Sequence, residues 1–154
     1  MPDTNEAYLQ IGEVAERTGV TQRTLRFYEE KGLLRPPERM DGGFRLYSED
    51  DVRRVDHIRR LQDLLGITLA DIKEMVDAEE MLLELKAQYR PDSDVDEKKV
   101  QLRKAIDVVS RQHDIVAQKA EQMSEMKSQL EERLQTFDRW MKELEQLERK
   151  APVA

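Results

Sequence analysis

The feature that most constrains the fold is a stretch without glycine or proline that runs from residue 92 to residue 151. Apolar residues recur in it in an unbroken alternation of four and three positions. Eleven of the 13 residues at these positions are apolar, and the set is Leu102, Ile106, Val109, His113, Val116, Ala120, Met123, Lys127, Leu130, Leu134, Phe137, Met141 and Leu144. An alternation sustained over about six heptads is typical of a coiled coil. The sequence therefore predicts one long helix over residues 93–150 with an apolar seam.

A helix of this length needs a partner for its apolar face, because long helices are not stable alone in water. One alternative is that it lies on the globular core of the same chain. The other predicted helices are too short to cover it, and the composition of 5% aromatic and 38% charged residues is thin for a large core. We therefore expect the seam to pack against a second copy, in a homodimer. The seam alone leaves parallel and antiparallel arrangements open.

Four residues on or beside the seam have more than one interpretation. His113 and Lys127 interrupt the apolar series, and polar residues at such positions fix the register at some cost in stability. The alternative is that His113 senses pH or a ligand. Met126 and Trp140 lie beside the seam and widen the apolar stripe. They pack on a second surface of the partner, or they line a ligand site.

The N-terminal part predicts a helix-turn-helix. A first helix is expected from near Ile11 until Gly19, which suits a left-handed residue after a helix. Thr21 is the expected N-cap of a second helix, which runs to about Lys31 and stops at Gly32.

A β-hairpin wing is predicted directly after this pair of helices. Pro36-Pro37 excludes a helix, and Asp41-Gly42-Gly43 is a strong turn signal. Phe44, Leu46 and Tyr47 then favour a strand.

Two capping-box patterns predict the next two helices. Ser48 with Asp51 begins one, and Thr68 with Asp71 begins the other. Ser93 is the expected cap of the long helix. The fold class is therefore mainly α. The predicted segments are a flexible tail (1–7), a winged helix-turn-helix domain that we call the head (8–75), a connecting helix and loop (76–92) and the long helix (93–150).

The charge is distributed unevenly, although the net charge of −7 is acidic. Residues 17–47 hold seven Lys/Arg and four Asp/Glu, a net +3, whereas residues 61–154 hold 15 basic and 21 acidic residues, a net −6. A modestly basic head on an acidic body favours nucleic-acid binding by the head alone.

The candidate nucleic-acid contacts lie on the second helix and the wing. Arg23 and Arg26 share a helix face, and guanidinium groups suit phosphate oxygens and guanine edges. Arg39 and Arg45 lie on the strands of the wing, which places them against the minor groove or the backbone. The alternative is a solvated charged face with incidental arginines. The predicted turn and wing favour the DNA-binding interpretation.

Other chemistry finds little support. Cysteine is absent, which excludes disulfides, thiolate metal sites and thiol redox sensing. Two histidines make a zinc site improbable, and Asp92, Asp94 and Asp96 lack the sixth-position glycine of a calcium loop. No nucleophile–histidine arrangement or phosphate loop indicates an enzyme, and no cofactor is expected. The sequence has no apolar run near 18 residues, so we expect a cytoplasmic protein without a membrane partner.

The motifs resemble those of the MerR family of bacterial transcription regulators. The resemblance rests on I-G-E-V-A-E-R-T-G-V-T-Q-R-T-L-R-F-Y-E-E-K-G-L-L-R-P, then G-G-F-R-L-Y, then L-G-I-T-L-A-D-I, and is dense over residues 8–75. It implies a winged helix-turn-helix dimer, held by an antiparallel coiled coil, that binds and distorts promoter DNA. The contacts that it implies are Thr21, Arg23, Arg26 and Tyr28 on the helix, and Arg45 and Tyr47 on the wing.

The resemblance implies double-stranded promoter DNA and RNA polymerase as partners, but no specific effector. The absence of cysteine separates the chain from the family's metal and redox sensors, so the expected signal is an organic effector or a partner protein. The candidate effector or packing surface is Met81, Leu82, Leu85, Tyr89, Phe137, Trp140 and Met141. Two rival functions remain: an architectural or excisionase-like DNA-binding protein, and a coiled-coil scaffold with a vestigial head.

Overall fold

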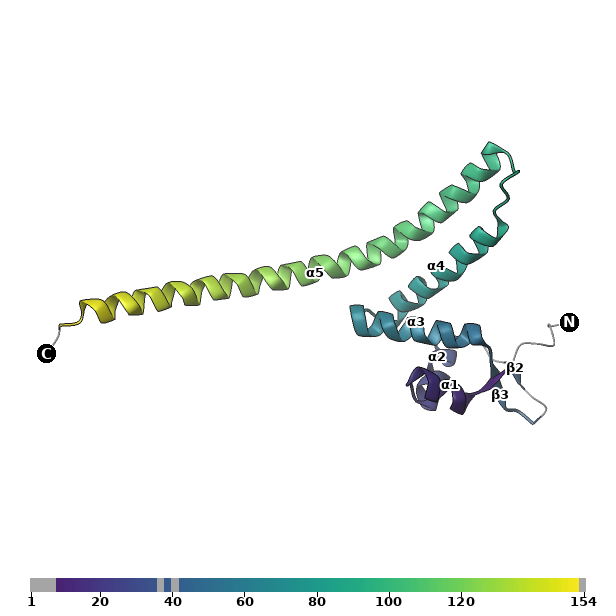
Figure 1. The fold of residues 1–154 in the computed structure, drawn as a ribbon, viewed down its shortest axis with the longest axis horizontal. Helices are drawn as coiled ribbons and strands as arrows, with labels where there is room; N and C mark the ends of the chain where they lie inside the picture. The colour runs from purple at the N-terminus through teal and green to yellow at the C-terminus, as the bar shows by residue number, and fades with distance from the viewer. Residues whose placement is uncertain (1–7, 36–37, 40–41, 153–154) are drawn as a thin grey trace. The chain divides into compact units, whose positions relative to one another are not determined.

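The computed structural model describes residues 8–35, 38–39 and 42–152, and it divides the chain into the compact units Met1–His113 and Asp114–Ala154. The elements in chain order are β1 (Leu9–Gln10), α1 (Ile11–Thr18), α2 (Gln22–Glu30), β2 (Glu38–Arg39), β3 (Arg45–Tyr47), α3 (Glu49–Leu65), α4 (Leu69–Gln88) and α5 (Val95–Lys150), as Figure 1 shows. The predicted tail and the Pro36-Pro37 break lie outside the described residues. The predicted division after residue 75 stays a prediction, and α4 continues across it.

The helix-turn-helix forms as predicted. Gly19 ends α1 with a φ of 74°, a left-handed conformation that residues with a Cβ rarely adopt. The guanidinium of Arg59 also lies against Gly19, where it donates to the Thr18 carbonyl. Thr21 caps α2, because its hydroxyl accepts a hydrogen bond from the Thr24 backbone N–H at 3.1 Å. A side chain at Gly19 would therefore meet both backbone strain and Arg59.

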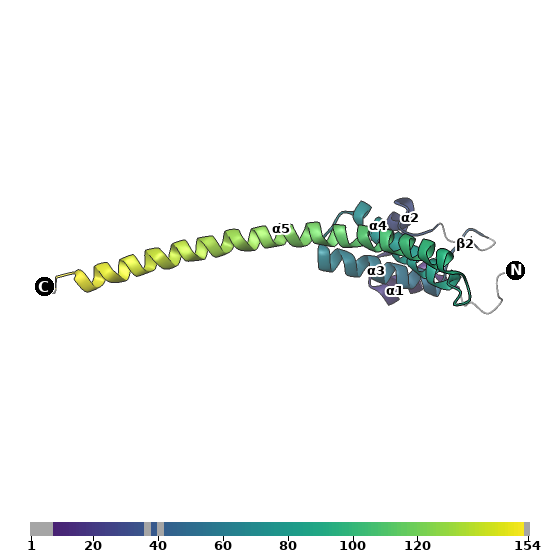
Figure 2. The ribbon, with the colours of Figure 1, turned by 90° about the horizontal axis from the view of Figure 1, so that it is seen from above.

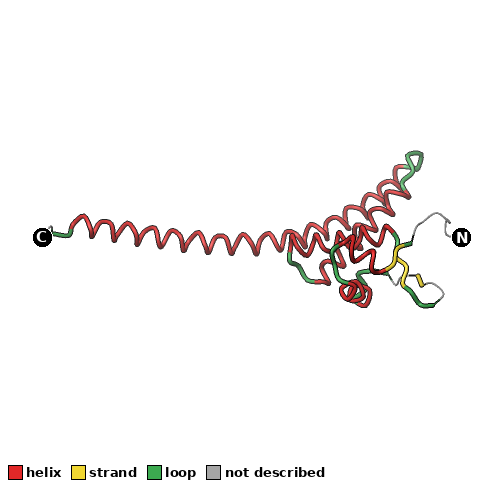
Figure 3. Tube along the Cα trace, turned by 60° about the horizontal axis from the view of Figure 1, so that its bottom comes forward, coloured by secondary structure: helices red, strands yellow, loops and turns green. Residues whose placement is uncertain are grey.

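The wing is part of a three-stranded antiparallel sheet in the order β1-β3-β2, drawn in yellow in Figure 3. The hairpin of β2 and β3 confirms the predicted wing. Strand β1 is a finding, since Leu9 pairs with Tyr47 and Gln10 with Leu46. The sheet thereby ties the wing to the start of α1.

The α3 cap is the predicted capping box. The Ser48 hydroxyl accepts from the Asp51 backbone N–H, and the Asp51 carboxylate accepts from the Ser48 N–H at 2.9 Å. Thr68 likewise accepts from the Asp71 N–H at 3.2 Å. The α5 cap differs from the prediction: the Asp94 carboxylate accepts from the Glu97 N–H at 2.8 Å. Ser93 instead donates its hydroxyl to the Arg90 carbonyl, one turn back in the loop.

One hydrophobic core holds the helices of the first unit together. In Figure 1, α3 lies between α4 and the pair α1 and α2. The side chains that fill the core are Val14, Leu25, Tyr28, Leu33, Leu34, Tyr47, Val52, Val55, Ile58, Leu61, Ile72, Met75 and Val76. In the described part of the chain, no helix is long and apolar enough to cross a membrane.

The N-terminal part of α5 has two faces with different surroundings. Its first turns run alongside α4 in Figures 1 and 2. The half-buried face holds Gln101, Ala105, Val108 and Gln112. Gln112 donates to the Met75 carbonyl at 3.2 Å. The predicted seam is a separate face, and its large apolar side chains stay exposed in the single chain.

Candidate nucleic-acid interface

Helix α2 presents the two predicted arginines to solvent. Arg23 and Arg26 are both exposed, and neither forms an ion pair within the described ranges. Thr21 is exposed at the N-terminus of the same helix. Phe27 extends this surface, with the Lys31 ammonium 5.7 Å from its ring centroid. Phe27 is absent from the predicted contacts, although its spacing of four from Arg23 places it on the arginine face.

The wing adds two arginines of different character. Arg39 is exposed on β2, where its Nη1 donates to the Gly43 carbonyl at 3.4 Å. Arg45 is half-buried, and its Nε donates to Glu29 of α2 at 3.0 Å. This ion pair joins the wing to α2. It uses one of the five guanidinium donors of Arg45.

Tyr28 does not belong to the exposed surface, contrary to the prediction. Its side chain is 3% exposed, and its hydroxyl donates to Gln62 of α3 at 2.9 Å. Burial raises the pKa of this hydroxyl. The physical reason is helical periodicity: Tyr28 follows Arg23 by five positions, which turns its side chain about 140° away from that arginine.

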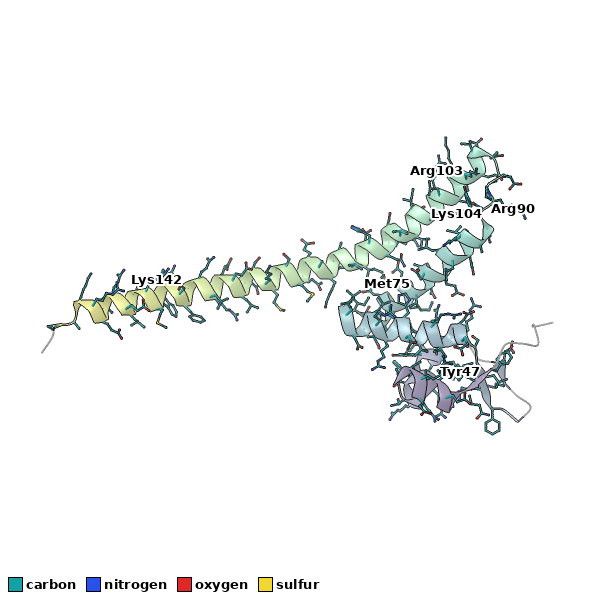
Figure 4. All side chains as sticks on the ribbon, in the orientation of Figure 1. Tyr47, Met75, Arg90, Arg103, Lys104 and Lys142 are labelled. Atoms are coloured by element: carbon teal, nitrogen blue, oxygen red, sulfur yellow. The ribbon has the colours of Figure 1, made fainter. Side chains whose placement is uncertain are left out.

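Tyr47 is likewise a core residue, with 1% of its surface exposed, and Figure 4 labels it in the head. Residues two apart on a strand share a face, so Tyr47 and Arg45 both point toward the helices. Only the longer Arg45 side chain stays partly accessible. Burial raises the pKa of the Tyr47 hydroxyl, which has no hydrogen-bond partner among the described residues.

Replacing each tyrosine with phenylalanine should change the stability differently at the two positions. Tyr28→Phe removes the bond to Gln62, so the free energy of unfolding should fall by about 0.5–1.5 kcal/mol. Tyr47→Phe removes a hydroxyl that lacks a described partner, so stability should stay equal or rise. Urea unfolding measures both. A loss of DNA affinity in Tyr47→Phe at unchanged stability would restore Tyr47 as a contact.

The comparisons with known proteins agree with this geometry. The model of the MerR HTH family regulatory protein matches residues 9–79. The chain is 34% identical over 124 residues to the HTH-type transcriptional regulator YfmP of Bacillus subtilis, which covers 80% of this chain and 89% of YfmP. It is 47% identical over 76 residues to the nodulation protein NolA of Bradyrhizobium elkanii, where the match covers 49% of this chain but only 34% of NolA.

A solved structure has the same fold. It is the crystal structure of HiNmlR, a MerR family regulator lacking the sensor domain, bound to promoter DNA. The TM-score is 0.51 at 20% sequence identity, and the match covers 86% of this chain and 92% of that chain. The fold therefore extends through most of the chain, beyond the residues that the family model matches.

Proposed function

The chain belongs to the MerR family of DNA-binding transcriptional regulators, and we propose that it binds promoter DNA as a homodimer and distorts it. The observation that carries the proposal is the pair of exposed guanidinium groups of Arg23 and Arg26 on the second helix of a helix-turn-helix. Arg39 and Arg45 extend this basic surface along the wing. The similar fold of HiNmlR, which was solved on promoter DNA, supports the same use of this surface.

The exposed seam of α5 supports the homodimer. Val109, Leu130 and Leu134 are examples of seam side chains that solvent reaches in the single chain. A row of exposed apolar residues at heptad spacing is stable only when a partner helix covers it. We propose that two heads, held by paired α5 helices, bind the two halves of a near-palindromic site.

The resemblance implies how such a dimer regulates transcription. Promoters of this family carry an overlong spacer between polymerase elements, and distortion of the DNA realigns them. Specificity then comes from the energy of DNA deformation as well as from base contacts. RNA polymerase is the proposed partner at the promoter.

Salt dependence tests the proposed DNA surface at Arg26. Arg26→Ala should weaken binding to operator and random DNA alike, because phosphate contacts do not read sequence. The slope of log K against log salt should fall by about 1–2 per dimer, at roughly 0.9 per phosphate contact. Arg26→Lys keeps the charge and should keep the slope. Fluorescence anisotropy over a salt series measures these values, and an unchanged slope in Arg26→Ala removes Arg26 from the interface.

An organic effector is the proposed signal. Met81 and Tyr89 are exposed on and just after α4, and Leu85 is half-buried. On the second unit, Phe137 and Trp140 pack edge to face with ring centroids 5.7 Å apart. Trp140 is the sole indole, so its emission should change when a hydrophobic, cationic compound binds there. If a broad set of such compounds changes neither the emission nor the DNA affinity, these residues serve packing alone.

A further inference from the structure

A cleft of about 550 Å³ lies between the wing, α3 and α4, within the first unit of the chain. Its volume is in the range of small-molecule sites in proteins. Its apolar lining consists of Leu46 on β3 and of Val76 and Leu83 on α4. Leu83 is 62% exposed, so its side chain is available to an apolar group of a ligand.

Each wall of the cleft places a carboxylate beside apolar side chains. On the wing, Glu38 of β2 lies directly opposite Leu46 of β3, and the side chains of such a cross-strand pair share a face of the sheet. On α4, Glu79 follows Val76 by three positions and precedes Leu83 by four, so these three residues share a helix face. The two walls therefore have the same chemistry, an acidic group next to an apolar surface.

The basic side chains of the lining do not favour an anionic ligand. The three arginines of the lining have acidic partners within the chain, in the pairs Arg35–Glu80, Arg53–Asp50, Arg54–Asp77 and Arg54–Glu80. Burial lowers the pKa of His57, the only histidine of the lining, so this side chain is neutral at pH 7. An anion would therefore have to displace a carboxylate of the chain itself.

Glu38 and Glu79, in contrast, have no cationic partner within the described part of the chain. Glu38 forms no ion pair there, and Glu79 accepts a hydrogen bond from the uncharged Gln112 of α5 at 3.4 Å. A cation therefore complements both positions. A metal ion does not suit the cleft, since no three His, Asp or Glu side chains of the described residues gather closely enough to hold one. An organic cation with charged ends and an apolar middle matches both walls.

We propose that this cleft binds a linear diamine or polyamine, with one ammonium group at Glu38, another at Glu79 and the methylene chain against the apolar lining. The proposal goes beyond the DNA-binding function, and it is independent of the effector surface proposed around Trp140. A bound polyamine joins the wing to α4. Because Glu38 is followed by Arg39, a proposed DNA contact, the ligand then restricts the part of the wing that meets DNA.

Isothermal titration calorimetry of the full-length protein with spermidine, at low salt and without DNA, tests the site. Glu38→Gln and Glu79→Gln should each raise the Kd about two- to five-fold, the effect of one exposed ion pair. The double variant should raise it about 4- to 25-fold, since the two positions act on separate ammonium groups. Glu74→Gln is the matched control, because it removes the same charge from an exposed position of α4 outside the cleft, and it should leave the Kd unchanged.

Two other ligands test the chemical class. Sebacate has a chain of similar length with a carboxylate at each end, and it should not bind. Mg²⁺ carries two positive charges without methylene groups, and at equal concentration it should not displace spermidine. Binding of sebacate as tight as that of spermidine, or displacement of spermidine by Mg²⁺, overturns the assignment to an organic dication.

The variants also separate this site from other binding to an acidic chain. If spermidine does not bind the wild-type protein, or binds the double variant equally well, the cleft is not its site. Operator affinity should respond to spermidine differently in the wild-type protein and the double variant, and this comparison cancels the effect of the polyamine on DNA itself. An equal response overturns the coupling to the wing. The proposed DNA surface stands or falls separately, on the salt dependence of Arg26→Ala.

Discussion

Replacing Leu130 and Leu134 with aspartate in the same chain should convert the dimer into a monomer and lower operator affinity by about 10²–10⁴-fold. Both side chains are exposed in the single chain, so the substitution leaves the core of the first unit intact. In the dimer, four buried carboxylates would face apolar side chains, which costs more than the seam contributes. Without the paired α5 helices, the second head is no longer held near its half-site at a high effective concentration.

Sedimentation velocity and anisotropy at fixed salt measure the two effects, on an operator located by footprinting. Gln129→Asp is the matched control, because it adds a carboxylate one position away, off the seam. It should leave the oligomeric state unchanged. A double variant that stays dimeric contradicts the proposed dimer contact along the seam. A monomer that keeps full operator affinity contradicts the proposal that pairing of the heads raises the affinity.

Arg54→Ala should lower the free energy of unfolding of the head by about 2–3 kcal/mol. The Arg54 side chain is 17% exposed and joins three parts of the first unit. Its Nε donates to the Leu33 carbonyl after α2, and its two other nitrogens donate to Asp77 at 2.7 Å and Glu80 at 3.1 Å on α4. Alanine leaves a part-buried carbonyl without its Arg54 donor and removes one donor from each of two carboxylates, of which Asp77 keeps Lys73 and Glu80 keeps Arg35.

The neighbouring arginine provides the control. Arg53 pairs with Asp50 on the surface of the same helix, and exposed pairs contribute little, so Arg53→Ala should change stability by less than about 0.5 kcal/mol. Burial alone would raise the pKa of Asp77, but hydrogen bonds from Arg54 and Lys73 hold it below its usual value. Equal effects of the two substitutions in urea unfolding would show that the hydrogen bonds of Arg54 do not stabilise the head.

Most features set by neighbouring residues were predicted from the sequence, although the cap of α5 was not. Gly19 and the Ser48–Asp51 capping box are local, because their geometry involves residues within one turn. Strand β1 was missed, since two residues are too few for an alternation and their partner Tyr47 lies far along the chain. The hydrogen bonds of Arg54 were missed for the same reason, because their acceptors are 21 to 26 residues away along the chain.

The exposure of the candidate contacts was predicted in part. Arg23, Arg26 and Arg39 are exposed, as their charge and position indicated. Tyr28 and Tyr47, which the family resemblance implied as contacts, are buried, because the helix and strand periods turn them toward the core. The role of the exposed residues in DNA binding stays a prediction.

The length of α5 bears on how this helix and the spacing of the DNA half-sites can change together. The helix is continuous over 56 residues and rises about 1.5 Å per residue. In the proposed dimer, its length therefore sets the distance between the two heads. Loss of one heptad keeps the seam in phase and brings the heads about 10 Å closer, roughly three base pairs. Loss of a single residue instead turns each flank by about 100° and breaks the seam. In the proposed dimer, we therefore expect half-site spacing to change with helix length in whole heptads.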